Sequence, residues 1–155
     1  MPDMVMRLGV LILVVVLLWT FTWYGRRFVE MRRRQALAAA PLDIMTVGGS
    51  NPVASNPAMD SDKTLVRILA FQSEDCHQCH TLQAPALKRL LETCGDTVAV
   101  VKVDAPGTPE LTQRYRVLTL PTTVILDATG NARAVNYGFA STQRLLEQVH
   151  AVLAG

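Results

Sequence analysis

An uncharged, strongly apolar run from Leu8 to Gly25 is the feature that most constrains the fold of this chain. At ~1.5 Å of rise per residue, the run spans roughly 27 Å as a helix, close to the hydrocarbon thickness of a bilayer. Aromatic rings, which favour the membrane interface, gather at its C-terminal end: Trp19, Phe21, Trp23 and Tyr24. We therefore expect residues 1–34 to be an N-terminal transmembrane anchor, with its helix at about 8–25 and a basic flank.

A cleaved signal peptide is the alternative reading of this run. Small residues at Ala38, Ala39 and Ala40 resemble a cleavage site, but they lie far downstream of the apolar run. Five Arg separate the two, whereas a signal peptide carries its positive charge before its apolar region. The pattern therefore favours an uncleaved, single-pass anchor in the cell membrane, which makes the lipid bilayer a partner of the chain.

The basic residues also predict which way the anchor is oriented. Arg7 stands alone before the run, while Arg26, Arg27, Arg32, Arg33 and Arg34 follow it. Because the more basic flank of a span usually stays in the cytoplasm, we expect the C-terminal part to be cytoplasmic. The alternative is an extracytoplasmic domain.

Charge and composition divide the remainder of the chain into a linker and one domain. Residues 35–62 contain Pro41, Gly48-Gly49 and Pro57 and few large apolar side chains, which indicates a flexible linker. Residues 63–155 are enough for one compact domain. The segment 35–155 carries nine basic and eleven acidic residues. This balance gives no reason to expect a nucleic-acid partner.

A Cys-x-x-Cys motif, Cys76-His77-Gln78-Cys79, lies between an apolar strand-like run and a helix-like run. At a helix start, the first thiol is stabilised as a thiolate nucleophile, and the second can resolve the mixed disulfide. Two alternatives use the same residues. With His80 the motif spells a c-type haem attachment site, and with His77 and His80 it could form a zinc site.

Apolar periodicity predicts alternating strands and helices from residue 63 onward. Strands are expected at 65–71, 98–103, 122–126 and 132–137, and helices at 81–93, 109–115 and from 141 to the end. Asp127 to Asn131 forms the turn of a hairpin. The order indicates an α/β fold whose sheet is covered by helices on both faces.

This arrangement resembles the thioredoxin family over roughly residues 63–153. The resemblance rests on the Cys76/Cys79 pair after the first strand, Pro85 in the next helix, Val101-Lys102-Val103-Asp104, and Leu120-Pro121-Thr122-Thr123. It implies a thioredoxin-like three-layer fold with a central mixed sheet. It also implies a cis peptide bond at Pro121 beside the cysteines, with the backbone of Leu120 offered to an extended substrate segment.

The motif also departs from the family pattern. Asp75 stands before Cys76 where Trp is usual, and His77 and Gln78 replace Gly-Pro. We expect these three residues to modulate the reactivity of the thiol pair. The family's buried acid is Ala70 here, so any carboxyl group for proton transfer must come from elsewhere, with Glu74 or water as candidates. Pro85 falls one place later than usual, and we expect the helix to kink there.

From these features we expect a membrane-anchored thiol-disulfide oxidoreductase that reduces protein disulfides through Cys76 and Cys79. It needs no cofactor or metal, and a separate recycling reductase reopens its disulfide. One alternative is an extracytoplasmic reductase or isomerase of the cytochrome-maturation type. The other is a non-enzymatic haem-binding, metal-binding or scaffold module. Cys94 is expected to be a packing residue.

Overall fold

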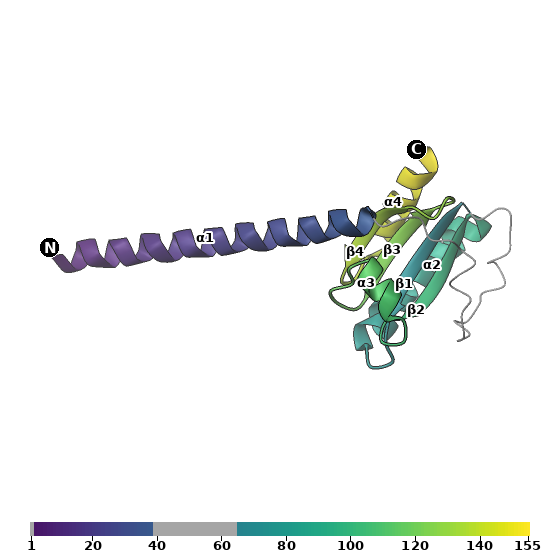
Figure 1. Ribbon diagram of the computed structural model, residues 1–155, viewed down its shortest axis with the longest axis horizontal. Coiled ribbons are helices and arrows are strands. Elements are labelled where there is room, and N and C mark those ends of the chain that lie inside the picture. Colours follow the sequence, from purple (N-terminus) through teal and green to yellow (C-terminus); the bar gives the residue numbers. More distant parts are fainter. Residues whose placement is uncertain (1, 39–64) are drawn as a thin grey trace. The chain divides into compact units, whose positions relative to one another are not determined.

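The computed structural model describes residues 2–38 and 65–155, with side chains described from residue 11 onward. The chain divides into two units, Met1–Arg34 and Gln35–Gly155. Figure 1 shows the long helix at the N-terminal end of the chain and the sheet and helices of the second unit. Residues 39–64, which contain most of the predicted linker, lie outside the described residues.

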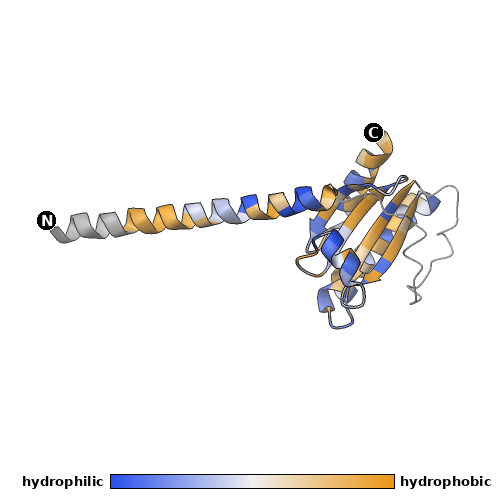
Figure 2. Ribbon diagram, viewed as in Figure 1, coloured by the Kyte–Doolittle hydropathy of each residue, from blue (hydrophilic) through white to orange (hydrophobic). Residues whose placement is uncertain are grey.

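The first unit is formed by the helix α1, which runs over Pro2–Leu37 and ends within the first residues of the second unit. Its stretch Leu11–Leu37 is long and apolar enough to cross a membrane, a criterion of length and composition that signal sequences also meet. Figure 2 shows apolar residues in the earlier part of this stretch and hydrophilic residues in the later part. The basic flank is therefore helical, and α1 continues past residue 35, where the predicted linker begins.

Contacts one helical turn apart support the basic part of α1. Arg27 lies over the ring of Trp23 at 5.5 Å, and Arg32 lies over the ring of Phe28 at 5.1 Å. Arg34 also pairs with Glu30 at 3.6 Å. Residues four apart face each other on a helix, so these pairs favour continued helix beyond the apolar run.

A four-stranded mixed sheet forms the centre of the second unit. Its strands are β1 (Val66–Gln72), β2 (Val98–Asp104), β3 (Thr122–Asp127) and β4 (Ala132–Tyr137), in the order β2-β1-β3-β4. β1 is parallel to β2 and antiparallel to β3, and β3 and β4 form the predicted hairpin. The predicted strands and the mixed sheet are therefore confirmed.

Helices cover both faces of this sheet. Helices α2 (Ala84–Cys94) and α4 (Thr142–Ala154) bury Leu90, Leu145 and Val149 against Ile68 of β1. On the other face, Tyr115 follows the short helix α3 (Pro109–Arg114) and packs edge to face on Phe71 at 6.2 Å. The predicted three-layer fold is confirmed, with a separate apolar core on each face.

The turn between β3 and β4 is organised by one carboxylate. One oxygen of Asp127 accepts hydrogen bonds from the backbone N–H groups of Thr129 at 2.9 Å and Asn131 at 3.0 Å, and from the Thr129 hydroxyl at 2.6 Å. Its other oxygen pairs with Arg133 at 2.7 Å. Burial raises the pKa of Asp127, but the hydrogen bonds outweigh this and lower it to about 2.

We predict that Asp127 stabilises the fold in a pH-dependent way. Its folded pKa lies below the ordinary value of ~3.9, so its contribution is present above pH ~4 and is lost as pH falls towards 2. Asp127→Ala should lower the free energy of unfolding by ~1–2 kcal/mol at pH 7, measured by urea denaturation of the full chain in detergent. The difference in free energy of unfolding between Asp127→Ala and the native chain should become smaller near pH 2. Asp96→Ala, at an exposed carboxylate, is the control, and an equal deficit at both pH values would contradict the prediction.

Candidate active site

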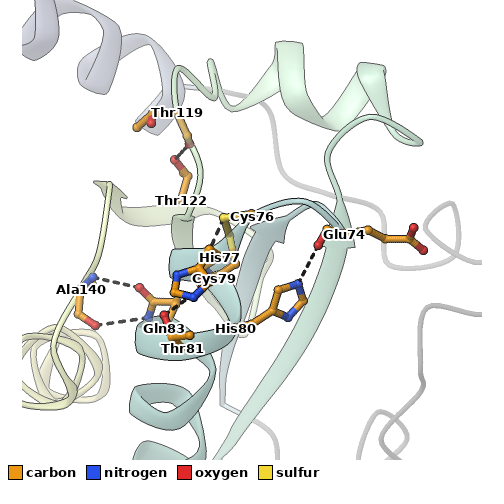
Figure 3. The surroundings of a disulfide bond; sticks show 10 residues. All are labelled: Glu74, Cys76, His77, Cys79, His80, Thr81, Gln83, Thr119, Thr122 and Ala140. Carbon is orange, nitrogen blue, oxygen red and sulfur yellow. Dashed lines mark hydrogen bonds between the residues drawn. A yellow bond between two sulfur atoms is a disulfide. The ribbon is translucent and has the colours of Figure 1, made fainter.

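Cys76 and Cys79 form a disulfide at the point where β1 gives way to a helix. Their Cα atoms are 5.3 Å apart, and the helical residues begin at His77. Cys76 is half-buried, whereas Cys79 is 2% exposed. The backbone N–H of Cys79 donates to the Cys76 sulfur at 3.2 Å (Figure 3). Cys76 is thus the more accessible sulfur, and it lies at the helix N-terminus.

This position suits a nucleophilic thiol. When the disulfide is open, a Cys76 thiolate would face the Cys79 N–H and the positive end of the helix dipole, which both stabilise negative charge. Asp75, His77 and Gln78, the predicted modulating residues, are all exposed around the pair. A carboxylate beside Cys76 opposes thiolate formation, whereas a protonated imidazole favours it.

The helix after the disulfide opens with a π-helical turn, Cys79–Gln83, in which the Ala84 N–H donates to the Cys79 carbonyl. A π-helical turn accommodates one residue more than an α-helical turn. Pro85 follows within a helix that is continuous from His77, so its missing N–H removes one backbone hydrogen bond to the preceding turn, where the π-helical turn is found. The irregularity predicted at Pro85 is therefore found earlier, at 79–83.

The peptide bond between Leu120 and Pro121 is cis, as the family resemblance implied. Pro121, Cys79 and Ala70 line one groove with a volume of about 750 Å³. The structure thus brings Pro121, from the start of β3, to the cysteine pair that follows β1. Leu120 is half-buried just before this bond.

The groove carries no carboxyl group in place of the family's buried acid. Ala70 is 4% exposed, and none of the described residues that line the groove is acidic. Glu74 is exposed, and Figure 3 shows its carboxylate pointing away from the disulfide. The backbone carbonyl of Glu74 lies 3.2 Å from Nε2 of His80. In this geometry Glu74 does not supply the acid that the sequence left open.

Gln83 is a site residue that the sequence did not reveal. Its side chain is 2% exposed, accepts from the Ala140 N–H at 2.9 Å and donates to the Ala140 carbonyl at 3.2 Å. Thr142 adds a second link by donating to the Ala86 carbonyl at 3.1 Å. Together these bonds tie the helix that carries Cys79 to the segment after β4. The partners are backbone groups far away in sequence, so no local pattern could have indicated them.

Cys94 is half-buried at the end of α2 and packs against the core that α2 shares with α4. Burial raises the pKa of its thiol, which favours the protonated form near neutral pH. Its expected packing role is confirmed.

In the part of the chain that the structure describes, no group of three His, Cys, Asp or Glu side chains could hold a metal ion.

Comparison with known proteins finds a family model described as Thioredoxin, which matches residues 56–151. The chain is 31% identical over 64 residues to "Thioredoxin 2" of Plasmodium berghei (strain Anka), which is 41% of this chain and 40% of that protein. It is 35% identical over 66 residues to "Thioredoxin Y2, chloroplastic" of Arabidopsis thaliana, which is 43% of this chain and 38% of that protein. The chain thus spans about two fifths of the length of these curated relatives.

Among solved structures, a chloroplastic thioredoxin z is similar to this chain with a TM-score of 0.53 and 29% sequence identity. The match covers 75% of this chain and 93% of that one.

We predict that Gln83 is needed for the stability of the site. Gln83→Ala would leave the buried Ala140 N–H and carbonyl without partners, which should lower the free energy of unfolding by ~2–3 kcal/mol. Gln143→Ala is the matched control, because Gln143 is exposed and its side chain donates to Glu147 on its own helix. Its effect should stay within ~0.5 kcal/mol. Urea denaturation of both variants tests this, and equal losses would be the contrary result.

Proposed function

The chain belongs to the thioredoxin family, and we propose that it is a thiol-disulfide oxidoreductase that is anchored in the cell membrane and reduces protein disulfides through Cys76 and Cys79. The proposal rests mainly on one observation. The two cysteines form a disulfide at a helix N-terminus, with one sulfur half-buried and the other almost fully buried. Such a pair can exchange electrons with a substrate disulfide without a metal or an organic cofactor.

The unequal burial assigns a role to each cysteine. Cys76, which is accessible, attacks a sulfur of the substrate disulfide as a thiolate and forms a mixed disulfide, while the other substrate sulfur leaves as a thiolate. Cys79 then attacks the Cys76 sulfur from within. This step releases the second substrate thiolate and forms the Cys76–Cys79 disulfide. The substrate gains two electrons, and a recycling reductase restores them to the pair.

Leu120 and Pro121 are proposed to position the substrate. Pro121 shares a groove with Cys79, so a substrate segment that reaches the sulfurs passes beside this loop. We propose that the segment pairs with the backbone of Leu120 in an extended conformation. Backbone pairing is independent of side-chain identity and suits substrates of varied sequence.

The membrane anchor is supported by the length and composition of Leu11–Leu37. Five Arg follow the apolar run and only Arg7 precedes it. This difference favours a cytoplasmic oxidoreductase domain, where reduction is the expected direction because thiols are kept reduced there. An extracytoplasmic domain, acting as a disulfide reductase or isomerase of the cytochrome-maturation type, is the alternative.

We predict that both motif cysteines are required for catalysis. In an insulin-reduction assay with dithiothreitol and the full chain in detergent, Cys76→Ser should lower the rate to that without protein. Cys79→Ser should instead accumulate a mixed disulfide, visible as an adduct on non-reducing gels, because the resolving thiol is missing.

Cys94→Ser is the matched control, because it removes a thiol outside the motif and should keep the rate within about twofold, as for a half-buried conservative change. A Cys76→Ser protein as active as the native chain would refute the assignment.

We also predict the side of the membrane. In intact cells, a membrane-impermeant thiol reagent should leave reduced Cys76 and Cys79 of the Cys94→Ser chain unlabelled, because the positive flank retains the domain inside. Permeabilising the cells should allow the reagent to label Cys76, the accessible thiol of the pair. Labelling without permeabilisation would establish the extracytoplasmic alternative.

A further inference from the structure

Residues 26–34, in the later part of α1, carry more positive charge than their own carboxylate balances. They contain five Arg and one acidic residue, Glu30, so five positive charges and one negative charge give a net charge of +4. A carboxylate oxygen of Glu30 lies 3.6 Å from Nε of Arg34, one turn further along the helix. Figure 2 shows that this hydrophilic part follows the apolar part of the helix. The remaining positive charge is available to an anion outside the chain.

Two of these Arg lie against aromatic rings. The guanidinium carbon of Arg27 is 5.5 Å from the centroid of the Trp23 ring, and that of Arg32 is 5.1 Å from the centroid of the Phe28 ring. Each ring belongs to the residue four positions earlier in α1. Each guanidinium is therefore directed back towards the apolar run, by about one helical turn or roughly 5–6 Å.

This direction brings the charges to the level of the lipid headgroups. The headgroup layer on each side of a bilayer is roughly 5–8 Å thick. The backbone of Arg32 lies ~10 Å beyond Gly25, the end of the apolar run, whereas Phe28 lies only ~5 Å beyond it. Over the Phe28 ring, the Arg32 guanidinium can therefore reach the phosphates of the layer. Arg27, over Trp23, lies closer still to the hydrocarbon.

A guanidinium that lies over a ring keeps its N–H donors available. The ring face contacts one side of the planar group, and the N–H bonds point outward within the plane. Two of these donors match two oxygens of one phosphate group, which gives a bidentate contact. Arg27 and Arg32 are five positions apart, or ~140° around the helix axis. The two pairs would therefore hold two different phosphate groups.

We infer that the later part of α1 binds the phosphate groups of anionic phospholipids, with Arg27 on Trp23 and Arg32 on Phe28 as the two contacts. This inference rests on the membrane anchor of the proposed function. The net positive charge selects anionic over zwitterionic lipids, since the latter carry a cation that the Arg residues repel. Anionic lipids are abundant in the cytoplasmic leaflet, the side proposed for the basic flank.

Trp23 can report on a lipid that is bound at Arg27. The chain contains two Trp, so Trp19→Phe leaves Trp23 as the single Trp. The full chain is reconstituted into vesicles of phosphatidylcholine and phosphatidylglycerol, and acyl-chain bromine, which quenches Trp fluorescence on contact, is placed on one of the two lipids. Brominated lipid and total composition are matched between samples. Brominated phosphatidylglycerol should quench Trp23 about threefold more strongly, because anionic lipid is enriched beside the basic helix.

Arg27→Lys separates a phosphate site from general charge attraction. Lys keeps the positive charge but lacks the planar fork that binds phosphate and lies over the ring, so the quenching ratio should fall towards one. Arg34→Lys is the matched control, because Arg34 pairs with Glu30 and should leave the ratio unchanged. The second contact is tested with Phe28→Trp as the reporter, in a chain whose other two Trp are replaced by Phe, and with Arg32→Lys as the variant.

Equal quenching by the two brominated lipids would overturn the inference. A preference that Arg27→Lys leaves intact would also overturn it, because charge alone would then attract the lipid. Failure of the proposed anchor has a different signature. Trp19, observed alone in Trp23→Phe, would then be quenched by neither lipid, since it would lie outside the bilayer. The fluorescence measurement does not involve the cysteine pair, so loss of disulfide reduction would leave it unaltered.

Discussion

The pairing of β1 with a strand on each side is the constraint on which the site depends. β1 is parallel to β2 and antiparallel to β3, and Phe71 near its C-terminal end lies opposite Thr122 at the start of β3. The chain leaving β1 reaches Cys76 after a short turn, and Pro121 directly precedes Thr122. The sheet register therefore brings the disulfide and the cis-proline loop to one edge, although they are far apart in the sequence.

Hydrogen bonds from side chains and from the backbone then hold the segments at this edge in fixed positions. Gln83 links the disulfide helix to Ala140, and Gly138 links the segment after β4 to Pro121. The disulfide helix, the segment after β4 and the Pro121 loop are thereby held to one another. Buried polar groups that are fully paired give a single arrangement, because any alternative would leave an N–H or carbonyl without a partner. A thiol site that must receive an extended segment benefits from such order, since less entropy is lost on binding.

The chemistry of the pair depends on its unequal environment. Cys76 has access to the surface and faces the N-terminal N–H groups of a helix, whereas Cys79 lies beneath it in the groove beside Ala70. The site differs from the family pattern in having no acid at Ala70 and in being flanked by exposed Glu74 and Asp75. These differences place negative charge on the surface before Cys76 and remove it from the interior behind Cys79.

Local patterns in the sequence identified most of the fold. Apolar runs such as Leu65 to Phe71 predicted the strands, and Asp127 to Asn131 predicted the hairpin turn, because strand periodicity and turn chemistry depend on neighbouring residues. The Cys76/Cys79 pair and Pro121 were found from motifs. The π-helical turn at 79–83 was not predicted from any motif, because the same residues fit an α-helix with a kink at Pro85.

The sequence by itself determined an apolar N-terminal helix, an alternating α/β order and a dithiol motif at a strand-to-helix junction, because each depends on the spacing of residues close together in the chain. Tertiary structure alone decided which sulfur is accessible, that Gln83 bonds to Ala140, and that Gly138 bonds to Pro121. These features depend on sheet register and on contacts between distant segments, whose free energies no local pattern encodes.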